Sequence, residues 1–145
     1  MQFLGGVRTV TGSCFYIRTS EIKMLVDCGM FQGEDSYDIN RAPFLVNPSE
    51  IDYLFLTHAH IDHSGLIPKL VRDGFSGEIV TTSATADLAE LLLYDSAHIQ
   101  ETDSEWQTRR ALRAGKEPVF PLYTLNDVKA SIPFFKKVSY GKIEH

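Results

Sequence analysis

The sequence predicts an α/β domain with a mixed sheet, because short strand-like segments alternate with segments of helical periodicity. Three strand candidates separated by turn residues open the chain, at residues 2–10, 13–19 and 23–26. An apolar run over residues 51–56 then leads into a helical pattern, which is typical of a buried strand followed by a helix. A further strand candidate, residues 78–82, precedes the longest helical pattern of the chain.

The helical segments are predicted from their apolar spacing. The first carries apolar residues at i, i+1, i+4 and i+5, namely Leu66, Ile67, Leu70 and Val71. The second covers residues 84–114, and its expected apolar stripe consists of Leu88, Leu91, Leu92 and Ile99. Asp95 falls on the same stripe beside His98, so we expect it to be buried and to need a partner. A hydrogen bond to His98 or to nearby backbone is favoured over an orientation toward a metal cleft.

The remaining segments carry less information. Residues 30–50 are predicted to form a loop, because they are rich in Gly, Pro and Asn, with one short helical turn at residues 48–50. Thr124 and Asp127 have the spacing of a capping box at the start of a short helix. A strand is expected to begin near residue 134.

Length and composition bound the class of protein. A chain of 145 residues with 43% hydrophobic and 23% charged residues is typical of one globular domain. The sequence shows no signal peptide and no apolar run of membrane-spanning length, so we expect a cytoplasmic protein without a membrane partner. Cys14 and Cys28 lack metal-ligand spacing and are expected to be reduced, small, buried apolar residues.

The charge distribution bears on nucleic-acid binding. The formal net charge of −5 argues against a protein that is basic overall. However, Arg109, Arg110, Arg113 and Lys116 cluster within a short segment. From the sequence alone, a solvated helix face is favoured over a track for phosphates.

The chemistry is concentrated in residues 57–65, which contain His58, His60, Asp62 and His63. Imidazole nitrogen and carboxylate oxygen are zinc ligands, and a His/Asp set without a cysteine pair is typical of catalytic zinc with an open position for water. His58 and His60 lie two residues apart, so in extended backbone they point the same way. The alternative is a histidine-rich surface loop that binds nothing.

The His58-x-His60-x-Asp62-His63 pattern resembles the signature motif of the metallo-β-lactamase superfamily. The resemblance implies an αββα sandwich and a site for two zinc ions. His58 and His60 would hold one ion, and Asp62 and His63 the other. Asp62 would also act in catalysis by orienting the attacking water.

Asp27 follows the strand candidate at residues 23–26 and precedes a glycine. It could cap a loop, or its carboxylate could orient a histidine ligand through the second ring N–H group. Residues 5–13 and 25–33 resemble the opening of the β-CASP branch of the superfamily, which contains RNA-processing nucleases. The resemblance implies that Asp27 belongs to the active site, as a support residue rather than a direct ligand.

The resemblance covers only the first part of the family's domain. Residues 1–145 are expected to form the N-terminal half of the sandwich, without the β-CASP insertion and the C-terminal half, and His145 is not counted as a ligand. The implied function is zinc-dependent hydrolysis of RNA phosphodiester bonds, with a ligand set that is incomplete here. Hydrolysis of small esters or thioesters, or a non-catalytic metal-binding or interaction role, are the alternatives. We expect a homodimer or a missing complementary segment, because one sheet alone would expose an apolar face.

Overall fold

Six strands form one mixed sheet in the computed structural model, which describes residues 1–7, 9–34 and 36–141. The strands are β1 (Gln2–Gly5), β2 (Cys14–Arg18), β3 (Lys23–Val26), β4 (Tyr53–Phe55), β5 (Glu78–Thr82) and β6 (Phe135–Val138), and they lie in chain order. The first three are antiparallel neighbours, whereas β3 to β6 are parallel. The predicted mixed sheet is therefore confirmed.

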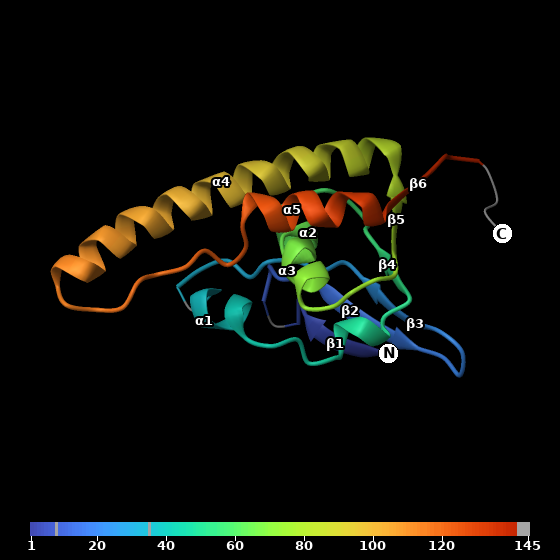
Figure 1. The fold of residues 1–145 in the computed structure, drawn as a ribbon. Helices are drawn as coiled ribbons and strands as arrows, with labels where there is room; N and C mark the ends of the chain where they lie inside the picture. The colour runs from blue at the N-terminus through green and yellow to red at the C-terminus, as the bar shows by residue number, and fades with distance from the viewer. Residues whose placement is uncertain (8, 35, 142–145) are drawn as a thin grey trace.

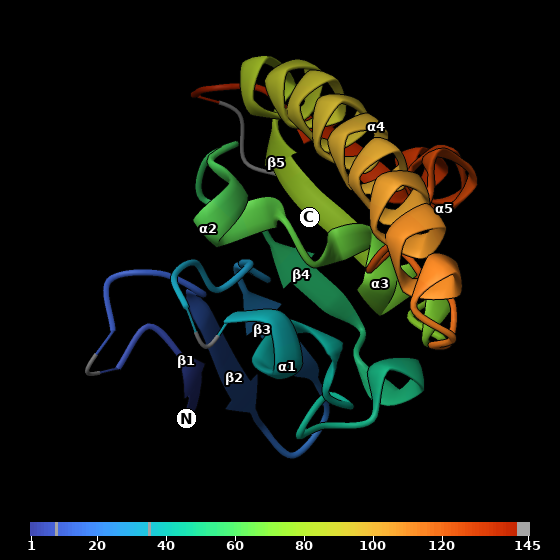
Figure 2. The same cartoon turned by 90° about the vertical axis from the view of Figure 1, so that its left-hand side faces the viewer.

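The helices lie in the segments that connect one parallel strand to the next (Figure 1). They are α1 (Ser36–Arg41), α2 (Ile61–Ser64), α3 (Ile67–Arg72), α4 (Ser83–Arg113) and α5 (Leu125–Ser131), with two 3₁₀ turns, η1 (Pro48–Glu50) and η2 (Ile132–Phe134). Helices α3, α4 and α5 lie on the same side of the sheet (Figure 2). Together with the strands they enclose one buried core, to which Leu25, Leu54 and Ile79 contribute from the sheet.

Two predictions for the first 50 residues are wrong: where the first strand ends, and that residues 30–47 form a loop without a helix. The first strand ends at Gly5 instead of continuing to residue 10, because the chain turns at Gly6, whose φ is 71°. Helix α1 lies within the segment that the sequence predicted to be a loop. Its buried Asn40 accepts a hydrogen bond from the Phe31 N–H and donates one to the Phe31 carbonyl, both at 2.8 Å. This helix therefore depends on a contact nine residues away, which local propensity does not reveal.

The predicted apolar stripe of α4 is also wrong. Leu88, Leu91 and Ile99 are 47%, 65% and 51% exposed, whereas the buried positions are Ala86, Ala89, Leu93, Ala97 and Ser104. Small side chains on this face let the helix approach the core closely. Leu88 and Leu91 are exposed, whereas Leu92 packs partly buried against the core, as predicted. Asp95 and His98 are exposed as well, so the expected buried aspartate and its partner do not occur. The predicted capping box at the start of α5 is confirmed, with Thr124 and Asp127 bonding each other's backbone N–H groups.

The second face of the sheet is apolar but has no helix over it among the described residues (Figure 2). The strand register places eight apolar side chains there: Phe3, Phe15, Ile17, Met24, Val26, Tyr53, Phe55 and Val80. None of them belongs to the buried core, and Phe3 and Phe55 are 56% and 39% exposed. We call this surface the open sheet face.

Candidate metal centre

The predicted site residues meet at one edge of the sheet. Asp27 follows β3, and the segment from Thr57 to His63 follows β4. Because β3 and β4 are parallel, their carboxyl ends lie at the same edge, which is where open α/β sheets place their sites. The sheet therefore brings together groups that are 30 and more residues apart in sequence.

Asp27 is the buried centre of a hydrogen-bond network. Its carboxylate Oδ1 accepts the backbone N–H and the hydroxyl of Thr57, both at 2.9 Å. Its Oδ2 lies 2.7 Å from Nδ1 of His63 and accepts a longer, 3.4 Å hydrogen bond from the Ser13 hydroxyl. Only 2% of Asp27 is exposed, and its φ of 61° is unusual for a residue with a side chain. Such strain persists only where surrounding contacts hold it, as this network does.

The network fixes the orientation of two histidines. Since an ionised carboxylate only accepts, Nδ1 of His63 carries the proton that points at Asp27. The Thr57 hydroxyl donates to Asp27, so its lone pair accepts from Nδ1 of His58 at 3.0 Å. Both rings therefore keep the lone pair of Nε2 free. This is the arrangement in which a carboxylate that bonds one ring nitrogen leaves the other nitrogen ready to bind a metal ion.

The predicted ligands lie side by side at the exit of β4. The ring centroids of His58 and His63 are 4.0 Å apart, and those of His58 and His60 are 4.8 Å apart. Nε2 of His63 lies 3.6 Å from Oδ2 of Asp62. His60 is the N-cap residue of α2, and its carbonyl accepts the N–H groups of His63 and Ser64.

The donor types fit zinc, but the described residues do not present a finished site. Three imidazoles and a carboxylate are groups that zinc takes, and His63 has its supporting carboxylate. Within the part of the chain that the structure describes, no group of three or more His, Cys, Asp or Glu side chains is arranged so that it could hold a metal ion. The ligand roles of His58, His60, Asp62 and His63 therefore remain a prediction. His145 lies outside the described residues.

Backbone hydrogen bonds from Ser13 and from residues 28–30 hold the histidine segment in place. The N–H groups of Ser13, Cys28 and Met30 donate to the carbonyls of Asp62, His63 and Ile61, at 2.8, 2.8 and 3.0 Å respectively. Gly29 lies between these bonds, and a Cβ atom at that position would be 1.7 Å from the Asp62 carbonyl oxygen. This close approach explains why the residue at position 29 is glycine.

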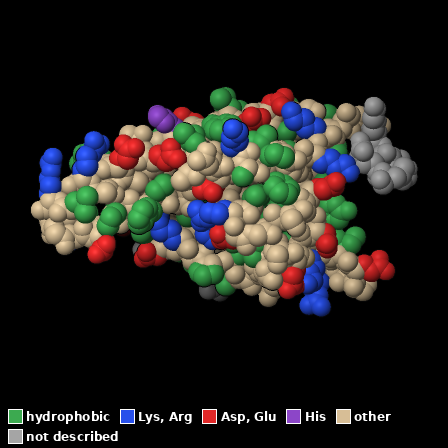
Figure 3. Space-filling model, in the orientation of Figure 1, with side chains coloured by type: hydrophobic (Ala, Val, Ile, Leu, Met, Phe, Trp, Pro, Cys, Tyr) green, Lys and Arg blue, Asp and Glu red, His purple; other side chains and the backbone are tan. Residues whose placement is uncertain are grey.

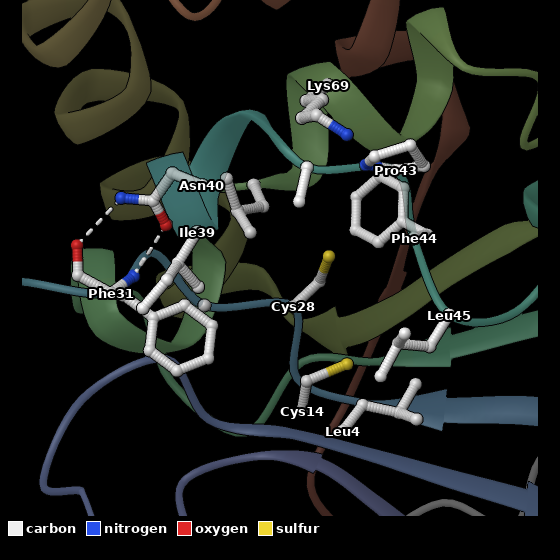
Figure 4. A pocket seen from close by; sticks show the side chains of 13 residues that line it. Leu4, Cys14, Cys28, Phe31, Ile39, Asn40, Pro43, Phe44, Leu45 and Lys69 are labelled. Atoms are coloured by element: carbon white, nitrogen blue, oxygen red, sulfur yellow. Dashed lines mark hydrogen bonds between the residues drawn. The ribbon is translucent and has the colours of Figure 1, made fainter. Parts of the chain in front are cut away.

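A separate apolar cavity of about 250 Å³ lies beneath α1 (Figure 4). Cys14 and Cys28 line it as free thiols, and both are buried, as the sequence predicted. A hydrogen bond with Cys14, together with burial, raises the pKa of Cys28 well above its usual value. Among the described residues that line it, Lys69 alone is charged; its ammonium lies 2.7 Å from Asp73 and 4.0 Å from the centre of the Phe44 ring. The described lining is therefore mainly apolar.

Sequence reasoning missed the roles of Thr57 and Ser13. Both hydroxyls donate to Asp27, and Thr57 also contacts His58. Thr57 stands directly before the first histidine, and this position was the only available signal. Ser13 is 14 residues from Asp27, so only the pairing of β2 with β3 brings them together.

Residues 7–128 match the model of the metallo-beta-lactamase superfamily. The chain belongs to this superfamily. Its single sheet with helices on one face agrees with the predicted half of the αββα sandwich. The match covers the site segment and both strands that position it.

Two relatives illustrate the branch. "Ribonuclease TTHA0252" of Thermus thermophilus is 34% identical over 95% of this chain and 28% of its own length. "Transcription termination factor FttA" of Methanocaldococcus jannaschii is 34% identical over 97% of this chain and 20% of its own length. The predicted resemblance to the superfamily and its β-CASP branch is thereby confirmed. The chain thus spans less than a third of these relatives.

Among solved structures, a metallo-beta-lactamase from Cronobacter sakazakii aligns with 99% of this chain and 46% of its own, with a TM-score of 0.49 and 21% identity.

In the described residues, no helix combines the length and the apolar character that crossing a membrane requires. The cytoplasmic location expected from the sequence remains a prediction.

Proposed function

We propose that this domain takes part in zinc-dependent hydrolysis of RNA phosphodiester bonds. The observation that carries the proposal is the network in which Asp27 orients His63 directly and His58 through Thr57. RNA as the substrate is supported by the relatives named as a ribonuclease and as transcription termination factors. His58, His60, Asp62 and His63 are the residues that would hold zinc.

Each group would have a separate task. Bound zinc supplies Lewis acidity, which lowers the pKa of water and stabilises charge on phosphoryl oxygens. Asp27 keeps the proton of His63 on Nδ1, and the Thr57 hydroxyl does the same for His58. Asp62, whose side chain is a quarter exposed beside His63, would orient the attacking water.

The test is cleavage of a labelled single-stranded RNA in the presence and absence of zinc. We expect zinc-dependent cleavage that His60→Ala abolishes. His98→Ala is the matched control, because His98 is exposed on α4 and belongs to no part of the network. Cleavage that persists without zinc, or that survives His60→Ala, would contradict the proposal.

The same assay separates the alternatives. Activity on nitrocefin or a glutathione thioester, with none on RNA, would identify a small-molecule hydrolase. Zinc binding without turnover of either class would identify a non-catalytic metal-binding domain. The described residues show no complete ligand set, so we propose that the 145-residue chain on its own binds zinc more weakly than a complete dinuclear site.

We further propose that a second copy covers the open sheet face when the 145-residue chain is alone. Phe3 packs edge-on against Phe15 with ring centroids 5.5 Å apart, and the Tyr53 and Phe55 centroids are 6.1 Å apart. The register places aliphatic residues beside these rings, and the charged Glu78 and Lys136 lie on the same face toward its β6 edge. Two such sheets can pack face to face, about 10 Å apart, as in other β-sandwiches.

A further inference from the structure

The far end of α4 carries a groove lined by Trp106, Arg109, Arg110 and Arg113. We call it the Arg–Trp groove; its volume is about 410 Å³. Trp106 is 58% exposed, and Cζ of Arg110 lies 5.7 Å from the centre of its ring. Figure 3 shows Lys and Arg side chains at the end of the molecule where α4 ends.

The three guanidinium groups have no acidic partner among the described residues. Four lysines elsewhere, Lys23, Lys69, Lys136 and Lys137, each have a carboxylate within salt-bridge distance. No salt bridge within residues 1–7, 9–34 and 36–141 involves an arginine of the groove, although Glu105 lies about one turn before Arg109 on the same helix. The groove therefore presents unneutralised positive charge, despite the net charge of −5.

The fold keeps this surface on a rigid element. Ser104, Thr108 and Ala111 form the inner side of the distal helix, and the Thr108 hydroxyl is bonded to both the N–H and the carbonyl of Val119. These contacts tie the returning chain to the inner side and leave the groove on the outer side. The surface is therefore held in place without using its own arginines.

The chemistry of the groove matches a single-stranded nucleic acid. Guanidinium groups form paired hydrogen bonds with phosphate oxygens, and an exposed indole offers a face on which an unpaired base can stack. An acidic polypeptide would use the charges but leave the indole face without a planar partner. We propose that the Arg–Trp groove binds single-stranded RNA away from the metal centre, an inference that rests on the proposed function.

The position of the groove sets the length of the RNA. Helix α4 begins after β5, at the sheet edge that carries the metal centre, and Arg109 lies about 39 Å further along at 1.5 Å per residue. At about 3.4 Å per stacked nucleotide, this length of helix corresponds to roughly a dozen nucleotides.

Trp106 is the single tryptophan of the chain, so its fluorescence reports on the groove directly. The experiment titrates the protein with a 20-nucleotide single-stranded RNA in EDTA and low salt, where zinc-dependent cleavage cannot occur. We expect fluorescence quenching by the single strand and much less by the corresponding duplex. Trp106→Ala, followed by RNA anisotropy, should weaken binding about tenfold through the loss of one stacked base.

The charge is tested by the triple variant Arg109→Gln, Arg110→Gln, Arg113→Gln. We expect at least a tenfold loss of affinity and a salt dependence of log K shallower by about 2, since each single-strand phosphate contributes about 0.7. The matched control removes three exposed basic side chains elsewhere, by Arg18→Gln, Lys129→Gln and Lys136→Gln, and should retain most of the affinity.

Three results would overturn the inference. They are an absence of quenching by RNA, an equal loss in the triple variant and its control, and quenching by a glutamate 20-mer as strong as that by RNA. The last result would assign the groove to an acidic polypeptide. Because the titration contains no zinc, a failure of RNA cleavage leaves this result intact, and a failure of binding leaves the proposed hydrolysis intact.

Discussion

Oδ2 of Asp27 lies 2.7 Å from Nδ1 of His63, although the two residues are 36 positions apart. The contact exists because β3 and β4 are parallel neighbours and both end at the same edge. The buried carboxylate also accepts two hydrogen bonds from Thr57, so it cannot rotate away without breaking them. The orientation of His63 is therefore built into the fold before any metal ion arrives.

Asp27→Asn should lower zinc affinity about 10- to 100-fold, the usual effect of losing a supporting carboxylate. Asparagine tolerates a positive φ, so the backbone should keep its conformation. Competition with a chromophoric zinc chelator would measure the change. Asp87→Asn is the control, because Asp87 is an exposed carboxylate paired with Lys137. Equal zinc affinity in Asp27→Asn and wild type would contradict the supporting role.

Gly29→Ala should lower stability by about 3 kcal/mol or more, because the added methyl group would overlap the Asp62 carbonyl oxygen. For a domain of this size, such a loss corresponds to a drop in Tm of roughly 10 °C. Gly115→Ala is the comparison. Its φ is 69°, but no atom lies within 4 Å of the added Cβ, so only backbone strain of about 1–2 kcal/mol is expected. Similar melting temperatures for the two variants would show that the close approach has little importance.

Tyr123→Phe should change how stability depends on pH. Burial raises the pKa of Tyr123, although its hydroxyl donates to Ser96 Oγ at 2.9 Å. The buried phenol stays protonated at a pH where the unfolded phenol ionises. Its contribution is therefore complete below the unfolded pKa of about 10 and is lost as pH rises through the folded pKa.

Denaturant unfolding of both proteins at pH 8 and pH 11 would test this. At pH 8 the Phe variant should be less stable by about 1 kcal/mol, the value of one hydrogen bond. At pH 11 the difference should shrink or reverse, because the variant has no phenol to ionise. A difference that is constant between the two pH values would refute the raised pKa.

Phe55→Lys should convert the proposed dimer into a monomer, because it places a charge in the middle of the open sheet face. Sedimentation velocity at micromolar concentration measures the oligomeric state. Leu45→Lys serves as control: Leu45 is 81% exposed but lies outside that face. A wild-type chain that sediments as a monomer would contradict the proposed dimer.

Patterns that depend on neighbouring residues could be read from the sequence. The spans of β3 and β5, the long helix after β5 and the Thr124–Asp127 capping box were predicted correctly, since each depends on local spacing. The types of metal-donor atom at His58, His60, Asp62 and His63 also follow from the residue types alone. The prediction missed helix α1 and assigned the wrong buried face to α4, because distant contacts decide both.

The alanines of α4 show the difference most clearly. Leucines at helical spacing suggested a buried stripe, yet the helix packs through Ala86, Ala89 and Ala97, which permit a close approach to the core. Burial depends on the shape of the opposite surface, which the helix's own sequence does not contain. Asp95 was misplaced for the same reason.

The sequence by itself determined the superfamily, the succession of strands and of the helices other than α1, and the residues that carry the chemistry, because these depend on residue type and local spacing. The tertiary structure alone decided that Asp27, Thr57 and Ser13 form one network around His63, that one sheet face is open, and that Trp106 stands beside three unpaired arginines on the described surface. Each of these depends on which distant segments the sheet register and helix packing bring together.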